Sequence, residues 1–564
     1  MTASYGIVLA ACLTLASVRG PGQAERSRAP ESEKYRPRPM EQRQLREPEQ
    51  LFVETEGKLW KAFPAGDGSL EVLVPAGLLE QELEICVLEY PDSRVVLQQG
   101  DRLLELKRES REDTGENFGE SLRGRGRKSE EEAYLPLGTV CREFGYIMDL
   151  PLGSLRIRLK DAGPEAGRKK LPTAYDYRQT GRHTRVRDQG NFGTCWSFAS
   201  VTAMETALKP EICREFSADH MSLNNGFSLD QEEGGEYIMS MAYVLGWQGP
   251  VLEEEDPYGD GISPEGLKPA VHVQEIQILP PGDYRAIKRA VFFRGGVQSS
   301  LYTSITDYRS RSAYYDEETG AYCYEGEEPP NHDVVIVGWD DRYPKENFRT
   351  EVEGDGAFLC VSSWGEAFGD RGYFYVSYYD ANIGSRNLVY TGIEAADNYD
   401  QIYQSDLCGW VGQVGYGSEK AFGANIYEAE DEELLRAVGF YAVGENTSYR
   451  IWLCRPADGE PDPEQKREVA RGTMRYSGFY TVPLEVPVPL EPGERFAVIL
   501  EAETPGAIHP LAVEFRADHA TEAADVTDGE GYVSADGINW ESLEEHHQCN
   551  LCLKAYTDKR EVRG

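Results

Sequence analysis

The stretch that decides the fold of this chain reads Gln189-Gly190-Asn191-Phe192-Gly193-Thr194-Cys195-Trp196-Ser197-Phe198. The apolar residues that follow recur with helical spacing up to Leu208, and Pro210 ends the pattern, so a helix is predicted here. Cys195 would then begin that helix, where unpaired N–H groups and the helix dipole favour a thiolate. A lone cysteine is more often a buried, inert thiol. The residues around Cys195 therefore have to be considered together with it.

A nucleophilic cysteine needs an imidazole that takes its proton and later delivers it to the leaving group. Among the eight histidines, His332 begins a pattern typical of a buried strand, Asp333-Val334-Val335-Ile336-Val337. His220, in Phe216-Ser217-Ala218-Asp219-His220-Met221, is the main rival for this role. Gln189 lies shortly before Cys195, and its side-chain amide could join the Cys195 backbone N–H in stabilising an oxyanion.

These segments resemble the active-site segments of the papain family, the C1 peptidases. The resemblance implies that Cys195 is the nucleophile, His332 the general acid and base, and Gln189 the oxyanion donor. It also places His220 at a helix start of the family, which implies a structural role for His220. Two departures are visible: Phe192 occupies the position of a second family cysteine, and Thr194 replaces a smaller residue. We expect neither departure to touch the reacting groups.

The family residue that orients the histidine is an asparagine, and the matching segment here is Ser362-Ser363-Trp364-Gly365. The orienting position is therefore Ser362. A serine hydroxyl is shorter than an asparagine amide, so it can hold the ring only if the strand lies closer or a water bridges. Two hypotheses stay open: an active enzyme with a loosely held histidine, and a degenerate, weakly active homologue. Trp364 would shield the catalytic pair from solvent.

Gly234 and Gly235, in Glu232-Glu233-Gly234-Gly235-Glu236-Tyr237, match the paired glycines whose backbone binds an extended peptide in this family. Main-chain pairing of that kind gives affinity with little sequence preference. An ordinary turn is the alternative interpretation of a Gly-Gly pair. The resemblance implies that Gly234, Gly235 and Trp364 bind substrate.

The resemblance predicts an α+β fold at residues 171–396: a papain-like two-lobed protease domain, with a helical lobe plus a β-barrel-like lobe. Residues 397–558 are similar to the lectin-like domain of bacterial C1 peptidases. Strand-like runs there predict an antiparallel β-sandwich, at Ala437–Val443, Tyr449–Leu453, Arg495–Leu500 and Leu551–Tyr556. The name describes a fold and does not establish sugar binding. Four aromatic residues could stack on sugars, although core packing is the favoured interpretation: Trp410, Tyr427, Trp452 and Trp540.

The N-terminal segment reads as a signal peptide at residues 1–24, with an apolar stretch at Ile7–Val18 and a small-residue cleavage site at Gly22-Gln23-Ala24. A lipid-attachment box at Leu9-Ala10-Ala11-Cys12 is the alternative. Residues 25–170 are predicted to be an N-terminal pro-region with a disordered leader, a small β-rich unit and a charged linker at about 107–132. Arg168-Lys169-Lys170 is either a processing site or a basic turn.

The net charge of −39 and the isoelectric point near 4.7 argue against nucleic acid as a partner. No long apolar run follows the N-terminus, so no transmembrane span is predicted. The segment His546-His547-Gln548-Cys549-Asn550-Leu551-Cys552 carries zinc-type ligands, but in a strand residues three apart point to opposite faces, so no metal site is predicted. The implied chemistry needs no metal or organic cofactor.

The sequence therefore favours a secreted cysteine endopeptidase, made as a zymogen, that cuts polypeptide substrates through a Cys195 thioester. One alternative is a catalytically weakened homologue that acts as an extracellular adhesin or a carbohydrate- or protein-binding module through the C-terminal domain. Another is acyl transfer rather than hydrolysis, since transglutaminases also use cysteine and histidine. The Gln189-to-Cys195 spacing and the Trp364-Gly365 strand favour the protease.

Overall fold

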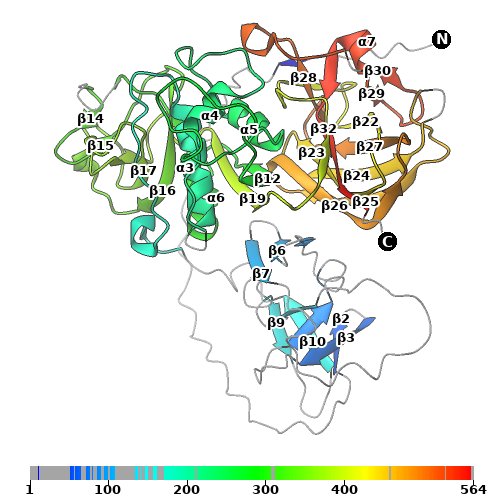
Figure 1. Ribbon diagram of the computed structural model, residues 1–564. Helices are drawn as coiled ribbons and strands as arrows, with labels where there is room; N and C mark the ends of the chain where they lie inside the picture. The colour runs from blue at the N-terminus through cyan, green and yellow to red at the C-terminus, as the bar shows by residue number, and fades with distance from the viewer. Residues whose placement is uncertain are drawn as a thin grey trace. The chain divides into compact units, whose positions relative to one another are not determined.

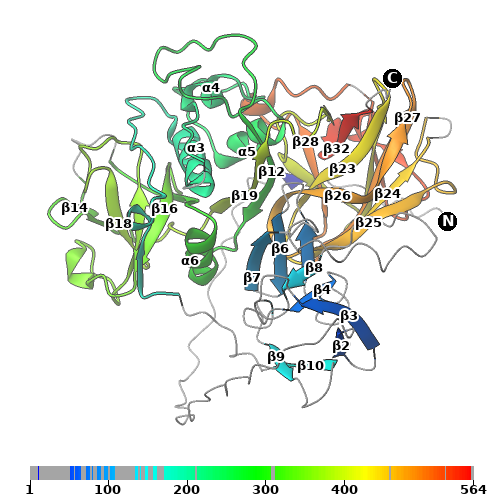
Figure 2. The same cartoon turned by 60° about the horizontal axis from the view of Figure 1, so that its bottom comes forward.

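The computed structural model describes residues 171–209, 212–305, 312–456, 459–527 and 529–560, together with short segments between residues 10 and 161. The chain divides into two compact units: Leu13–Lys169 is one, and Met1–Cys12 with Lys170–Gly564 is the other. Figures 1 and 2 show the elements of both units. The predicted signal peptide (apart from Ala10–Ala11), the leader and most of the charged linker lie outside the described residues.

The unit at Leu13–Lys169 is built from strands, as its sequence predicts. One sheet has the order β8-β4-β3-β2-β10-β9 and a second has the order β5-β6-β7. Strands β4, β5 and β6 lie within the stretch for which the sequence predicts a small β-rich unit. The strand bounds are β2 Leu51–Thr55, β3 Lys58–Pro64, β4 Val72–Pro75, β5 Cys86–Glu89, β6 Arg94–Gln99, β7 Arg102–Lys107, β8 Tyr134–Pro136, β9 Tyr146–Asp149 and β10 Arg156–Asp161.

Residues 171–396 form two lobes, one helical and one rich in strands (Figure 1). The helices are α3 Cys195–Leu208, α4 Ala218–Leu223, α5 Tyr237–Leu245 and α6 Tyr284–Phe293. The strands are β11 Ala174–Asp176, β12 Val271–Ile278, β13 Val297–Leu301, β14 Tyr315–Asp316, β15 Ala321–Tyr322, β16 His332–Asp340, β17 Ala357–Val361, β18 Tyr373–Ser377 and β19 Asn387–Ala395. One apolar core surrounds α3 and α5 and extends onto β16 and β17, and a second lies around α6 and β13.

Helix α3 confirms the helix predicted from the opening stretch. It begins at Cys195 after the N-cap Thr194 and ends at Leu208, two residues before Pro210. Residues Trp196 through Thr206 are all buried, because the helix packs on α4 and α5 and on strands β16 and β19. A helix buried on every side fixes its first residue in place, which matters because that residue is Cys195.

Residues 397–560 confirm the predicted antiparallel sandwich. One layer is the six-stranded sheet β25-β24-β27-β22-β29-β30, and strands β26, β23, β32 and β20 form the opposing layer. One apolar core joins both layers. The elements are β20 Gln401–Tyr403, β21 Gly412–Val414, β22 Lys420–Glu428, β23 Glu433–Ala442, β24 Thr447–Cys454, β25 Arg467–Met474, β26 Ser477–Leu490, β27 Arg495–Glu503, β28 Leu511–Phe515, β29 Gly531–Ser534, β30 Glu541–Ser542, α7 Leu543–His547, β31 Cys549–Leu551 and β32 Leu553–Lys559.

A smaller sheet in the order β1-β21-β28-β31 completes this part, with β1 at Ala10–Ala11. Three 3₁₀ helices lie at Tyr177–Thr180, Lys345–Asn347 and His519–Thr521. Among the described residues, no helix is both long and apolar enough to cross a membrane.

The two-lobed part and the sandwich share one sheet, which the sequence did not predict. Strand β12 pairs antiparallel with β26, so the sheet runs from β14 through to β20 without a break. The Thr481 hydroxyl donates to Gln274 Oε1 at 2.7 Å across this junction. At the close approach of the strands, Gly478 has φ +139°, and a Cβ there would lie 2.1 Å from the Ile276 carbonyl oxygen.

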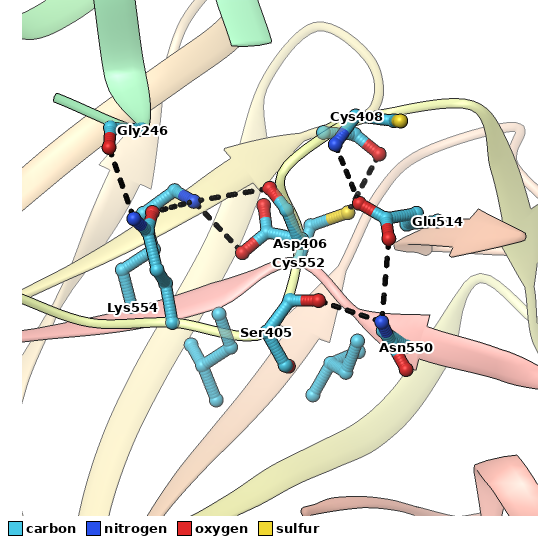
Figure 3. Close-up of polar contacts among 12 residues, drawn as sticks. Gly246, Ser405, Asp406, Cys408, Glu514, Asn550, Cys552 and Lys554 are labelled. Atoms are coloured by element: carbon cyan, nitrogen blue, oxygen red, sulfur yellow. Dashed lines mark hydrogen bonds and ion pairs between the residues drawn. The ribbon is translucent and has the colours of Figure 1, made fainter. Parts of the chain in front are cut away.

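A buried polar cluster lies inside the sandwich where it meets the helical lobe (Figure 3). The Lys554 ammonium donates to Asp406 Oδ1 at 2.8 Å, and both side chains are at most 1% exposed. Glu514 accepts hydrogen bonds from the Cys408 backbone N–H at 2.6 Å and from Asn550 Nδ2 at 3.3 Å. Burial and the neighbouring Asp406 charge raise the pKa of Glu514 to about 8.

We expect Gly478→Ala to destabilise the protein by about 2 to 4 kcal/mol, since it adds a methyl group against a carbonyl in a backbone region that L-residues avoid. Chemical denaturation measures the loss. Gly506→Ala is the matched control, because Gly506 also has positive φ, +77°, but open space around it. Equal losses in the two variants would contradict a tight β12–β26 junction.

The raised pKa of Glu514 predicts a pH-dependent stability. Between about pH 4.5, the ordinary value, and about pH 8, the folded protein binds a proton that the unfolded chain has released. This contribution to stability is therefore present at low pH and falls as pH rises, by at most about 1.4 kcal/mol per pH unit. Glu514→Gln should remove that slope, measured as urea denaturation from pH 5 to 8.5. The exposed Glu445→Gln is the control, and a slope unchanged by Glu514→Gln would sink the prediction.

Candidate active site

Cys195, the first residue of α3, is half-buried. Burial raises the pKa of its thiol, and the nearby Asp333 carboxyl acts in the same direction. The backbone N–H groups of Asp333, Trp196 and Cys195 itself lower that pKa, because they hydrogen-bond to the sulfur. The thiol thus lies at the start of the helix and against the start of β16, whose first two residues are His332 and Asp333.

His332 is buried, and both its ring face and one ring nitrogen have partners. Its Nε2 lies 3.1 Å from Ser362 Oγ, and its ring stacks on Trp364 with centroids 4.2 Å apart and planes 13° from parallel. Because Nε2 is taken by Ser362, Nδ1 is the nitrogen left for the thiol. The serine thus reaches the imidazole directly, which is the closer-strand alternative of the two expected.

The charges of this pair depend on each other. Burial lowers the pKa of His332 just as it raises the pKa of Cys195, so either charge alone is disfavoured. Opposite charges on two buried groups offset part of their loss of solvation when the groups lie close together. The arrangement therefore suits a thiol that becomes nucleophilic only together with its histidine.

Gln189 is held in place by the segment that carries Ser362. Its backbone N–H donates to the Ser363 carbonyl at 2.8 Å, and its Oε1 accepts from the Ser363 hydroxyl at 2.6 Å. Its Nε2 donates to the Phe192 carbonyl at 2.7 Å. An amide nitrogen carries two hydrogens, so one remains for a substrate oxygen.

Tyr258 and Thr194 support this site, and the sequence analysis gave neither a role. The Tyr258 hydroxyl donates to the Gln189 carbonyl at 2.8 Å and lies 2.7 Å from Thr194 Oγ1. Thr194 therefore does not touch the reacting groups itself, but it braces the loop that carries Gln189. In the sequence, the Thr194 hydroxyl was the only sign of this supporting role. No local pattern links a threonine to a tyrosine so far along the chain.

Asp333 is a third residue of the site to which the sequence pattern assigns no role. Its carboxylate accepts from Ser300 Oγ at 2.6 Å and from Gln298 Nε2 at 2.9 Å. These bonds pin the start of β16 to β13 and so fix the backbone of His332. The available signal was a charged residue at the head of an apolar strand, directly after the histidine.

The paired glycines lie against the nucleophile segment. The Gly193 N–H donates to the Gln231 carbonyl at 2.7 Å, and a Cβ on Gly193 would lie 2.7 Å from the Gly234 Cα. A Cβ on Gly235 would lie 2.3 Å from Trp196 Nε1. A side chain on Gly193 or Gly235 would clash with its neighbours. The surface next to the Cys195 segment is therefore formed by backbone atoms.

Three other sequence expectations have clear placements. Trp364 is 4% exposed, with one face against His332 and Phe368 edge-on at 4.8 Å, so it shields the pair and offers little surface to a substrate. His220 lies in α4, its Nδ1 2.7 Å from the Tyr243 hydroxyl. Cys549 lies in strand β31, as expected, and the described part of the chain contains no group of three metal-type ligands.

The four aromatic residues weighed for sugar stacking pack inside the sandwich or at its junction. Tyr427 is 3% exposed in the main core, and Trp452 and Trp540 pack on a second cluster around Ile426. Trp410 packs against Tyr441, with ring centroids 5.7 Å apart.

Sequence comparisons divide the chain at the same places. Residues 171–393 match the family described as Papain family cysteine protease, and residues 402–557 match the one described as Lectin like domain. Cathepsin K of Mus musculus is 28% identical over 211 residues, which are 36% of this chain and 59% of the relative. Cathepsin K of Gallus gallus is 31% identical over 212 residues, 36% and 58% of the two chains. The chain thus spans about three fifths of the length of these curated relatives.

The fold is similar to solved structures that contain both parts. The cysteine protease and lectin-like domains of Cwp84, a surface layer associated protein of Clostridium difficile, are 26% identical, with a TM-score of 0.62 over 69% of this chain and 90% of that one. The clostridial cysteine protease Cwp84 after propeptide cleavage is 27% identical, with a TM-score of 0.62 over 69% and 99% of the two chains.

The hydroxyl of Ser362 should control the reactivity of Cys195 through His332. Ser362→Ala removes the only side-chain hydrogen bond described for the ring, so we expect alkylation of Cys195 by iodoacetamide at neutral pH to slow about 10-fold, the equivalent of ~1.4 kcal/mol. Ser362→Thr keeps the hydroxyl and should stay within about 2-fold of the native rate. The rate is read by mass spectrometry of the Cys195 peptide, and an Ala variant as reactive as the native protein would show that Ser362 does not orient the ring.

Proposed function

The chain contains a papain-family cysteine protease domain at residues 171–393 and a lectin-like domain at residues 402–557, and from this we propose that it is a secreted cysteine endopeptidase made as an inactive precursor. The observation that carries the proposal is the pairing of a helix-start cysteine with a histidine held from its far side: Cys195 begins α3 beside β16, and His332 is fixed by Ser362 and Trp364.

The proposed reaction is hydrolysis through a thioester. Cys195 Sγ attacks the peptide carbonyl as its proton passes to His332 Nδ1. The Cys195 N–H and the second hydrogen of Gln189 Nε2 stabilise the oxyanion. The imidazolium then protonates the leaving amine, the C–N bond breaks, and a thioester remains. A water, deprotonated by His332, hydrolyses the thioester and returns the thiol.

Substrates are proposed to be polypeptides bound in an extended conformation along Gly234 and Gly235. The close approach of Gly193, Gly234 and Trp196 supports this, because it exposes backbone that can pair with a peptide backbone. We also propose that the lectin-like domain contacts glycans or a cell surface. Only the name of the domain supports this part of the proposal.

Secretion and a precursor form are proposed from separate observations. The first residues have the pattern of a signal peptide. Cwp84 is described as surface layer associated, and one of its structures follows propeptide cleavage. In this chain Leu13–Lys169 is a separate compact unit that ends in the basic run Arg168-Lys169-Lys170. A cut at that run would separate the unit from the protease domain.

The alternative of a weakened homologue arose from Ser362, which replaces the family asparagine. The direct 3.1 Å contact between Ser362 Oγ and His332 Nε2 favours an active enzyme, because the ring keeps a polar partner on the side away from the thiol.

The proposal predicts that the purified protein, without residues 1–170, cleaves an unfolded protein substrate and that Cys195→Ala abolishes cleavage. His332→Ala should lower kcat/KM by about 10² to 10⁴ and abolish labelling by an epoxide thiol probe, since the thiolate loses its proton acceptor. His546→Ala, an exposed histidine in the lectin-like domain, is the matched control and should cleave as the native protein does. Native protein that neither cleaves nor labels would refute the proposal in favour of a binding module.

A further inference from the structure

The segment at residues 226–246, here called the substrate segment, carries Gly234 and Gly235 and continues into helix α5. On its inner side it contacts the nucleophile loop through the hydrogen bond from the Gly193 N–H to the Gln231 carbonyl, 2.7 Å. Gln231 is itself held by α4, because its Nε2 donates to Asp219 Oδ1 at 2.9 Å and to Ser222 Oγ at 2.8 Å. The outer side of the substrate segment contacts the lectin-like domain at both ends of the segment.

The first end of the substrate segment packs on the loop after β20. The Cys408 thiol donates to the Gly226 carbonyl at 3.0 Å, and a Cβ on Gly226 would lie 2.7 Å from the Leu407 carbonyl oxygen. Two residues on, the Ser228 N–H donates to the Ala520 carbonyl at 2.8 Å. The approach is backbone against backbone, so it leaves no room for a side chain at Gly226.

The loop that makes this contact is itself anchored inside the sandwich. Figure 3 shows Glu514 between the Cys408 N–H and the Asn550 amide, with Asp406 on the other side bound to Lys554. A buried ion pair resists displacement, because moving either partner leaves an uncompensated charge. Residues 405–408 therefore form a rigid support.

The same support also holds the far end of the substrate segment. The Gly246 carbonyl, just beyond α5, accepts from Gln404 Nε2 at 3.0 Å, and Gln404 Oε1 accepts from the Lys554 ammonium at 2.8 Å. A carbonyl at a helix end has no partner within the helix, so Gln404 satisfies a group that would otherwise need water. Both ends of the segment are thus tied to one buried cluster.

We propose that the lectin-like domain is a positioning element of the protease, which fixes the glycine backbone that binds extended substrates while leaving the reactivity of Cys195 unchanged. The inference rests on the proposed function. Its physical reason is that main-chain pairing requires donor–acceptor distances near 2.9 Å, so a small shift of Gly234 and Gly235 breaks the pairing. Cys195 and His332 are held instead by the burial of α3 and by the pairing of β16 with β13 and β17.

The test is Gly226→Ala, which forces the substrate segment and Leu407 apart. For a peptide that extends at least three residues on the N-terminal side of the scissile bond, KM should rise about 10-fold, while kcat and the rate of Cys195 alkylation by iodoacetamide stay within about 2-fold. Gly415→Ala is the matched control: its Cβ would meet Pro510 and His509 at 2.7 and 2.8 Å, inside the same domain but away from the substrate segment. It should leave KM unchanged.

Gln404→Met gives a second, milder variant, because methionine fills the same space without the hydrogen bond to Gly246. Its KM should rise about 3-fold, in the same direction as that of Gly226→Ala. Equal KM changes in Gly226→Ala and Gly415→Ala, or a loss of kcat and alkylation with KM unchanged, would overturn the inference. If Gly226→Ala does not fold, an unchanged KM in Gln404→Met is sufficient to overturn the inference. A native protein that alkylates but cleaves no peptide would instead reject the proposed function.

Discussion

The structure depends on the contact between the first turn of α3 and the first residues of β16. This contact brings the Cys195 sulfur to the backbone N–H of Asp333, the residue that directly follows His332 in β16. Neither segment could hold that position alone. The helix is fixed because it is buried on all sides, and the strand is fixed because the Asp333 carboxylate is bound by Ser300 and Gln298. Polar bonds buried in this way are strong only when every partner is present.

The residues around Cys195 and His332 limit the formation of a thiolate and of an imidazolium. Burial opposes both the thiolate and the imidazolium when each is alone, so the site favours charges that appear together. Ser362 holds the ring from behind and Trp364 keeps water from its face. Ser362 directly follows β17, and its hydroxyl lies 3.1 Å from His332 Nε2, so this side chain reaches the ring although it is shorter than asparagine.

The sandwich is continuous with the protease domain and is not a separately tethered module. Strands β12 and β26 pair directly, and Gly478 permits their close approach. Beyond that sheet, Cys408, Ala520 and Gln404 hold the segment that carries the paired glycines. The two parts therefore meet through shared strands and buried backbone contacts, and the segment with the paired glycines is held from both sides.

The sequence by itself determined the features that depend on local pattern. The helix from Cys195 to Leu208, the strand that begins at His332 and the strands of the sandwich follow from apolar periodicity and from turn residues. The resemblance to C1 peptidases added the candidate residues. What only the tertiary structure decided was contact between segments distant in the chain: Ser362 within reach of His332, Tyr258 bridging Thr194 and Gln189, and Leu407 pressed on Gly226. Such contacts are set by the packing of one element on another, and no local pattern of residues encodes the distance at which two elements meet.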